Sequence, residues 1–219
     1  MIKWILKEEE IMINSNMSNT YHKVVKVVNK YNLISPGDKI AVEVSADKNS
    51  YMLMQCLRKF QQEADKNFEI EYFVVEKDNK NSSQVEEILK AYEIHKYHSV
   101  KEENVEEIYT MIEEVGCNVI ALPINYNDIL NLTFMTLMER KKPPKIYPKS
   151  VAKESKSIEV IRPLCIVEDK DIVKDLKNMK MEITEDTAIF GKLSYIEEGI
   201  HKDKCQNSVK YHFSVYEGL

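Results

Sequence analysis

Lys39-Ile-Ala-Val-Glu-Val44, then Ser45-Ala-Asp-Lys-Asn-Ser50, then a helical stretch from Tyr51 to about Ala64 decide the fold of this chain. The first segment has the apolar run of a buried strand, and the second is a polar turn. A turn between a buried strand and a helix points backbone N–H groups and the helix N-terminus at one spot, which suits an anion. The sequence therefore indicates a turn of the phosphate-binding kind.

This turn lacks the residue that such a site normally requires. Glycine lets the main chain close on a phosphate, yet the five glycines of the chain all lie elsewhere. Asp47 also adds a carboxylate to the turn. A carboxylate about 4 Å from one phosphate charge opposes phosphate binding by on the order of 4 kcal/mol at an effective dielectric near 20. The alternative to a phosphate site is a plain strand-to-helix connection, with Asn49 or Ser50 as the helix N-cap.

Strands and helices alternate through most of the chain. Apolar periodicity predicts helices over 18–31, 51–64, 83–92, 102–115, 127–139 and 169–179, and strands over 39–44, 68–75, 95–100, 117–122 and 157–164. This order predicts an α/β fold, with a parallel sheet, right-handed crossovers and helices on both faces. The predicted apolar face of the helix at 127–139 consists of Ile129, Leu130, Phe134, Leu137 and Met138.

Length and composition suit one such domain, since the 219 residues are 43% hydrophobic and 31% charged. We expect it to span residues 17–180, between an N-terminal extension over 1–16 and a C-terminal extension over 181–219. An alternating run at 209–215 predicts a late edge strand. The opening segment is too short and too acidic for a signal peptide, and no stretch reaches the length of a membrane span. We therefore expect a cytoplasmic protein that does not bind membranes.

The four cysteines are widely spaced and form no CxxC pair. Cys56 and Cys117 lie in apolar patterns, where a cysteine usually acts as a small buried hydrophobe. The five histidines form no recognisable relay either. We expect no metal site from this sequence.

Residues 140–156 carry seven basic side chains against one acid, a local charge of +6 in a chain of net charge −5. Three prolines keep this segment out of regular helix. Its candidate RNA contacts are Arg140, Lys141, Lys142, Lys145 and Lys149, with Tyr147 for base stacking. The alternative is a solvated loop. Arg162, just beyond, is a further RNA-binding candidate as an anion contact at the edge of the cleft; the alternative is an ion pair with an acidic side chain nearby, such as Glu168 or Asp169.

The order of these features resembles the PP-loop ATP pyrophosphatase superfamily, and within it the tRNA 2-thiocytidine synthetase branch. The resemblance covers roughly residues 17–180. The matching stretches are Ile34-Ser-Pro-Gly-Asp-Lys-Ile40, Ser45-Ala-Asp-Lys-Asn-Ser50, Ala121-Leu-Pro-Ile-Asn-Tyr-Asn-Asp-Ile-Leu130, Lys142-Pro-Pro-Lys145, Ile161-Arg-Pro-Leu164 and Glu168-Asp-Lys-Asp-Ile172.

The resemblance implies a nucleotide-binding α/β fold that binds ATP with magnesium, adenylates a tRNA base and releases pyrophosphate. In the thiolating branch, an iron–sulfur cluster held by a CxxC and a further cysteine then supplies sulfur. The nucleotide-binding residues that it implies here are Ser45, Ala46, Asp47, Lys48, Asn49, Ser50, Asn127 and Asp128. From the residues alone, Asn127 and Asp128 are better explained as the N-cap of the following helix.

The chain also departs from the family pattern. Ala46 and Asp47 replace both glycines of SGGxDS, Asn49 replaces its acid, and the cluster cysteines are absent. Two hypotheses follow. The chain is either a pseudoenzyme with weakened or lost ATP pyrophosphatase activity that binds tRNA or a protein partner, or an active ATP-dependent enzyme that adenylates a tRNA base without an iron–sulfur cluster. The apolar opening segment and the family resemblance are compatible with a homodimer.

Overall fold

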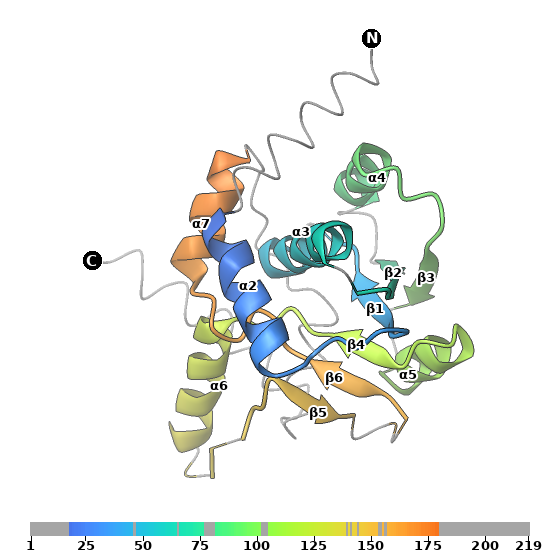
Figure 1. The fold of residues 1–219 in the computed structure, drawn as a ribbon. Helices are drawn as coiled ribbons and strands as arrows, with labels where there is room; N and C mark the ends of the chain where they lie inside the picture. Colours follow the sequence, from blue (N-terminus) through green and yellow to red (C-terminus); the bar gives the residue numbers. More distant parts are fainter. Residues whose placement is uncertain are drawn as a thin grey trace.

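The computed structural model describes residues 18–179, except 46, 65, 77–81, 102–104, 139, 141, 144, 153, 154 and 156. A six-stranded sheet in the order β3-β2-β1-β4-β6-β5 lies at its centre (Figure 1). The strands are β1 (Lys39–Glu43), β2 (Glu69–Glu76), β3 (His98–Lys101), β4 (Val119–Ala121), β5 (Lys149–Val151) and β6 (Glu159–Ile161). All neighbours pair in parallel except β5 and β6, which are antiparallel.

The helices that connect and cover these strands are α2 (Ser18–Lys30), α3 (Lys48–Glu63), α4 (Ser82–Ala91), α5 (Val105–Glu114), α6 (Tyr126–Met138) and α7 (Asp169–Asn178). The predicted α/β fold with a largely parallel sheet is confirmed, with boundaries shifted by a few residues. No helix in the described part of the chain is long and apolar enough to cross a membrane. The predicted domain limits at 17 and 180 stay a prediction, and the predicted strand at 209–215 lies outside the described residues.

The sheet separates two hydrophobic cores because neighbouring residues of a strand point to opposite faces. Ile40 and Val42 of β1 pack in the larger core, to which α2, α3, α4 and α7 contribute. Ala41 between them packs in the smaller core with apolar side chains of α5. The predicted placement of helices on both faces of the sheet is therefore confirmed.

Strand β5 lies inside the basic segment and was not predicted. It pairs with β6 through the register Lys149↔Ile161 and Val151↔Glu159, which makes it an edge strand of the sheet. Three residues are too few for a visible period in the sequence, and the prolines and lysines around them favour a loop.

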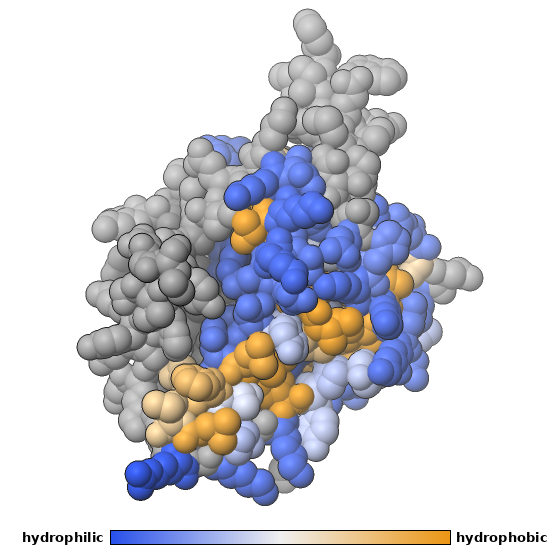
Figure 2. Space-filling model, turned by 90° about the vertical axis from the view of Figure 1, so that its left-hand side faces the viewer, coloured by the Kyte–Doolittle hydropathy of each residue, from blue (hydrophilic) through white to orange (hydrophobic). Residues whose placement is uncertain are grey.

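Of the predicted apolar face of helix α6, Ile129 packs against the larger core, whereas Leu130, Phe134, Leu137 and Met138 are exposed, so the prediction is wrong for these four. Its buried side chains are Leu132 and Thr136. The large apolar side chains at its surface are Tyr126, Leu130, Phe134, Leu137 and Met138, with exposed fractions of 42, 47, 57, 53 and 71%. Figure 2 faces the side of the molecule on which α6 lies and shows apolar atoms gathered over its lower part.

The first and the last described helices are fastened together. Asp171 of α7 accepts a hydrogen bond from Asn19 Nδ2 at 2.8 Å and pairs with Lys23 Nζ at 2.6 Å. Asp175, one turn further along α7, accepts from the backbone N–H of Thr20 at 3.1 Å. These carboxylates satisfy a free N–H at the start of α2 and hold α7 against that helix.

Candidate functional site

The candidate site lies where the strand order reverses. From β1 the chain moves outward to β2 and β3, and it then returns to β4 on the other side of β1. Ligands of open parallel sheets bind at the carboxyl ends of the strands at such a switch point. The turn after β1 and the turn after β4 both follow strands that end at this edge.

The turn after β1 is closed by its own carboxylate. Asp47 is the N-cap of α3, and its Oδ1 accepts hydrogen bonds from the backbone N–H groups of Asn49 at 3.0 Å and Ser50 at 2.9 Å. The predicted N-cap, Asn49 or Ser50, is therefore wrong, and α3 begins three residues before Tyr51. An aspartate in this position stabilises the helix by satisfying its first N–H groups and by opposing the positive end of its dipole.

The turn after β4 is fixed by a reciprocal pair of hydrogen bonds. Asn125 Oδ1 accepts from the backbone N–H of Asp128 at 2.9 Å, and Asp128 Oδ2 accepts from the backbone N–H of Asn125 at 3.0 Å. This is the geometry of a capping box, with Asn125 as the N-cap of α6. The expectation that Asn127 or Asp128 caps the helix is corrected to Asn125, which the Asn-x-x-Asp spacing indicates.

Side chains join the two turns to the start of α7. Asn49 Nδ2 donates to Asp128 Oδ2 at 2.9 Å, which links α3 to α6. Asn125 Nδ2 donates to Asn49 Oδ1 at 3.2 Å and to Asp169 Oδ1 at 2.6 Å. Lys48 Nζ lies 2.8 Å from the same Asp169 oxygen. Three helix N-termini thus meet in one polar network, in which the sequence analysis missed Asn125 and Asp169.

The remaining predicted residues lie around this network. Asn127 Oδ1 accepts from the backbone N–H of Asp169 at 2.9 Å and so caps α7 from a different helix. Ser45 Oγ accepts from the backbone N–H of Asp47 at 3.3 Å. The hydroxyl of Ser50 is buried and has no hydrogen-bond partner in the described part of the protein. Ala46 lies outside the described residues.

Asp128 has an unusual ionisation equilibrium. Its pKa is raised to about 7, mainly by burial and also by the charges of Asp169 and Asp47, against the opposing effects of the Asn125 N–H and the charge of Lys48. Since the ordinary pKa is 3.8, the folded protein keeps a proton on Asp128 between about pH 4 and 7 that the unfolded chain releases. The stability contributed by this group is therefore present at low pH and is lost as the pH rises toward 7.

The substitution Asp128→Asn is expected to remove this pH dependence. The amide oxygen of asparagine still accepts from Asn49 and Asn125, but no buried charge forms at high pH. Urea unfolding at pH 5 and pH 8 measures the effect: from pH 5 to pH 8 the natural chain should lose more stability than the variant. Equal changes in both proteins would show that Asp128 ionises normally.

The groups at the turn do not fit an ATP phosphate as they stand. The two N–H groups that open α3 are bonded to Asp47, Lys48 is paired with Asp169, and Asn49 is bonded to Asp128. An incoming phosphate would meet the carboxylate of Asp47 and not free donors. One carboxyl group of raised pKa beside an amide is also a poor magnesium site, since this cation prefers ionised carboxylates completed by phosphate oxygens.

The three described cysteines are not gathered as the ligands of an iron–sulfur cluster. Cys56 and Cys165 lie in the larger core, whereas Cys117 lies in the smaller one on the other side of the sheet. Burial raises the thiol pKa of Cys165 to about 11 and of Cys117 to about 12, so that both disfavour the thiolate that binds iron. Among the described residues, no group of three or more metal-binding side chains comes together.

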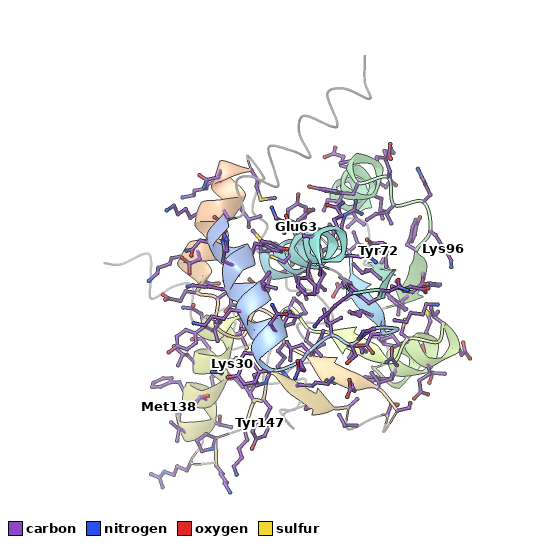
Figure 3. The ribbon with its side chains drawn as sticks, viewed as in Figure 1. Lys30, Glu63, Tyr72, Lys96, Met138 and Tyr147 are labelled. Carbon is purple, nitrogen blue, oxygen red and sulfur yellow. The ribbon has the colours of Figure 1, made fainter. Side chains whose placement is uncertain are left out.

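A second polar surface is formed by the basic segment and the end of α2. Arg140, Lys142 and Lys145 are exposed, and Tyr147 is 55% exposed. Lys149 Nζ lies 2.7 Å from Glu159 and donates to the carbonyl of Asn32 at 3.4 Å, which brings the end of α2 to this segment. Figure 3 shows Lys30 and Tyr147 at the same end of the molecule. We call Lys30, Tyr31, Arg140, Lys142, Lys145 and Tyr147 the basic surface; Lys141 lies outside the described residues.

Arg162 does not belong to the basic surface. Its side chain is 1% exposed, and its Nη1 donates to the carbonyl of Tyr147 at 3.0 Å and to Ser150 Oγ at 2.9 Å. It therefore holds the start of β5 against the end of β6 from inside the protein. This burial contradicts the expected anion contact at the surface, whereas the expected ion pair with Glu168 or Asp169 stays a prediction.

The fold resembles that of a solved structure. The structure superposes on the U34-tRNA thiolase NcsA from Methanococcus maripaludis, solved with its [4Fe-4S] cluster, with a TM-score of 0.62 and 14% identity over 94% of this chain and 80% of that one. No protein-family model matches the sequence. With its largely parallel sheet and its turn at the switch point, the chain has an adenine nucleotide alpha hydrolase-like fold.

In sequence, the chain is similar to the tRNA-cytidine(32) 2-sulfurtransferases. It is 32% identical to the enzyme of Neisseria gonorrhoeae over 192 residues, which are 76% of this chain and 59% of that protein. It is 30% identical to the enzyme of Salmonella arizonae over 195 residues, 78% of this chain and 62% of that protein. The chain thus spans about three fifths of the length of these curated relatives.

Proposed function

We propose that this chain is a PP-loop pseudoenzyme that binds tRNA without activating it with ATP. The observation that carries the proposal is the hydrogen bonding of Asp47 to the N–H groups of Asn49 and Ser50. A carboxylate covalently attached to the turn is present at a very high effective concentration, and ATP must displace it to bind. The charge of Asp47 also opposes phosphate directly.

Sulfur transfer through an iron–sulfur cluster is not part of the proposed function. Of the four cysteines of the chain, Cys56 and Cys165 lie in the larger core and Cys117 lies in the smaller core on the other side of the sheet. An iron–sulfur cluster is held by several thiolates that lie close together, whereas these thiols are buried among apolar side chains.

Two observations support tRNA as the partner. The relatives are named for their action on a tRNA cytidine. The basic surface combines exposed cations with two exposed tyrosines, Tyr31 at 41% and Tyr147 at 55%. Cations bind the phosphates of RNA, and aromatic rings stack on unpaired bases such as those of a tRNA loop.

One observation favours the alternative, an ATP-dependent enzyme that adenylates a tRNA base. The hydroxyl of Ser50 is buried at the start of α3 and has no hydrogen-bond partner among the described residues. A bound ligand would supply the missing hydrogen bond. Binding of Mg²⁺-ATP distinguishes the two functions, and its measurement is set out in the Discussion.

Removing the cations of the basic surface is expected to weaken tRNA binding. The triple variant Arg140→Ala, Lys142→Ala, Lys145→Ala loses three candidate phosphate contacts, each of which releases about 0.9 counterion on binding. The slope of log K against log salt should therefore become less steep by about 2 to 3. Fluorescence titration of labelled tRNA at several salt concentrations measures both the affinity and the slope.

The matched control removes three exposed lysines from other elements, through Lys90→Ala, Lys96→Ala and Lys177→Ala. It changes the net charge by the same amount and should leave the salt slope close to that of the natural chain. If both triple variants bind tRNA as the natural chain does, the basic segment is a solvated loop and tRNA is not its partner.

A further inference from the structure

The proposed function leaves the outer side of α6 unexplained. Its large apolar side chains are between 42 and 71% exposed, and we call them the α6 stripe: Tyr126, Leu130, Phe134, Leu137 and Met138. From Ile129 to Met138 the helix has no charged residue, so no charge on it opposes contact with another apolar surface. Five large side chains exposed by about half leave on the order of 500 Å² of apolar surface, as much as the largest patch on a typical monomer. A patch of this size usually marks an interaction site.

The chain itself contains a segment whose apolar pattern matches the stripe. It lies after α7, outside the described residues, and its large apolar side chains are Ile189, Phe190, Leu193, Ile196 and Ile200. Apart from Phe190, these residues follow one another at intervals of four, three and four, which is typical of one face of a helix. Leu130, Phe134 and Leu137 of α6 have the same intervals of four and three, the pattern in which side chains of paired helices interdigitate. We call residues 189–200 the tail segment.

The charges around the two patterns are complementary. Residues 182–198 carry five acidic side chains against one lysine, a net charge of −4. Residues 140–156, just beyond the end of α6, carry +6. The opening segment over 1–16, which also lies outside the described residues, has three glutamates and two lysines and so a net charge of only −1. Charge therefore favours the tail segment over the opening segment as the occupant of the stripe.

The tail segment can reach the stripe from the end of α7. Asn125 Nδ2 lies 2.6 Å from Asp169 Oδ1, so α6 and α7 begin side by side. At a rise of about 1.5 Å per residue, α7 spans about 15 Å, and Phe134 lies about 12 Å along α6. The path from the end of α7 to the middle of the stripe is therefore roughly 30 Å. The stretch of chain from Met179 to Ile189 covers about 33 Å when it is extended.

We infer that the tail segment lies along the α6 stripe of its own chain. Its apolar residues pack between Leu130, Phe134 and Leu137, and it runs parallel to α6, so that Glu197 and Glu198 lie near the cations that follow this helix. A tethered segment meets the stripe at an effective concentration of about a millimolar, which gives it an advantage over a separate molecule in dilute solution. This contact does not depend on tRNA binding.

Photo-cross-linking from the centre of the stripe tests this contact in the full chain. The cross-linking residue p-benzoylphenylalanine replaces Phe134, and an equal mixture of unlabelled and heavy-nitrogen-labelled protein is illuminated, digested with trypsin and analysed by mass spectrometry. We expect residue 134 to be joined to the tryptic peptides 181–192 or 193–202, with both halves carrying the same isotope because they come from one molecule. In the matched control the same cross-linking residue replaces Tyr97, which is 46% exposed just before β3, and should give no such product.

Two double variants test which side of the tail segment makes the contact. Leu193→Glu with Ile196→Glu places two charges on its apolar face and should abolish the cross-link. Ser194→Glu with Tyr195→Glu adds the same charges beside that face and should keep the cross-link. A far-UV circular dichroism spectrum checks that both variants are folded as the natural chain is. Cross-links of mixed isotopes only, which come from a second molecule, overturn the inference, and so do cross-links to residues 1–16 alone, the absence of any cross-link from residue 134, or a cross-link that survives Leu193→Glu with Ile196→Glu.

Discussion

The triple variant Ala46→Gly, Asp47→Gly, Asn49→Asp is expected to bind Mg²⁺-ATP with micromolar affinity, whereas the natural chain shows no saturable binding. The substitutions rebuild the sequence Ser-Gly-Gly-Lys-Asp-Ser, which frees the N–H groups of residues 49 and 50 from Asp47. Removing a carboxylate about 4 Å from a phosphate is worth on the order of 4 kcal/mol, or about three decades of affinity. The new carboxylate at position 49 faces Asp128 across the present 2.9 Å hydrogen bond, so magnesium is needed to neutralise the pair.

Calorimetric titration of Mg²⁺-ATP into both proteins measures this effect, and a thermal shift with and without nucleotide checks that both are folded. Asp47→Asn is the matched control, because an asparagine N-cap keeps an oxygen for the same two N–H groups but carries no charge. This control is expected to stay without binding, since the N–H groups remain occupied. Micromolar binding by the natural chain would contradict the pseudoenzyme proposal and leave the adenylating enzyme as the function.

Arg162→Met is expected to destabilise the protein by about 3 kcal/mol without a specific effect on tRNA binding. The guanidinium is 1% exposed, and its loss leaves the carbonyl of Tyr147 and the hydroxyl of Ser150 without their donor. Each buried polar group left unsatisfied costs about 1–3 kcal/mol. Methionine keeps much of the side-chain volume, so the loss of stability comes mainly from the missing hydrogen bonds and not from a cavity.

Denaturant unfolding measures the stability change for Arg162→Met, with Arg140→Ala as the control. Because the side chain of Arg140 is exposed, its removal should lower the stability by less than about 0.5 kcal/mol. The two arginines should thus have opposite effects, with stability lost at position 162 and RNA affinity lost at position 140. An Arg162 variant of normal stability that binds tRNA weakly would instead put the guanidinium at the RNA surface.

The fold was predictable because periodicity and order along the chain are local properties. Helices and strands of opposite period alternate, and that alternation predicts a parallel sheet. Two elements escaped this reasoning. Strand β5 exists because Arg162 and β6 hold it, which is tertiary context that a three-residue segment cannot encode. The outward stripe of α6 has the same period as a buried one, so the sequence alone does not reveal which way it faces.

The position of the site was predictable, but its hydrogen bonds and ion pairs were not. The strand-turn-helix pattern at residues 39–64 located the switch-point turn, and Asp47 was correctly recognised as its unusual residue. That carboxylate was expected to repel a phosphate. In the structure it is the N-cap of α3 and accepts hydrogen bonds from two backbone N–H groups. The ion pair of Lys48 with Asp169 joins residues 121 positions apart and follows from the fold, not from any local signal.

The hydrogen bonds and the ion pair between α2 and α7 have a consequence for folding during synthesis. Asn19, Thr20 and Lys23 are among the first of the described residues to leave a ribosome, and their partners Asp171 and Asp175 are among the last. The start of α2 therefore stays incomplete for the whole time between the synthesis of these two segments. A nascent chain halted before residue 169 has its inner strands but lacks the contacts of Asp171 and Asp175 with α2, so we expect chaperones and proteases to act on it more readily than on the folded protein.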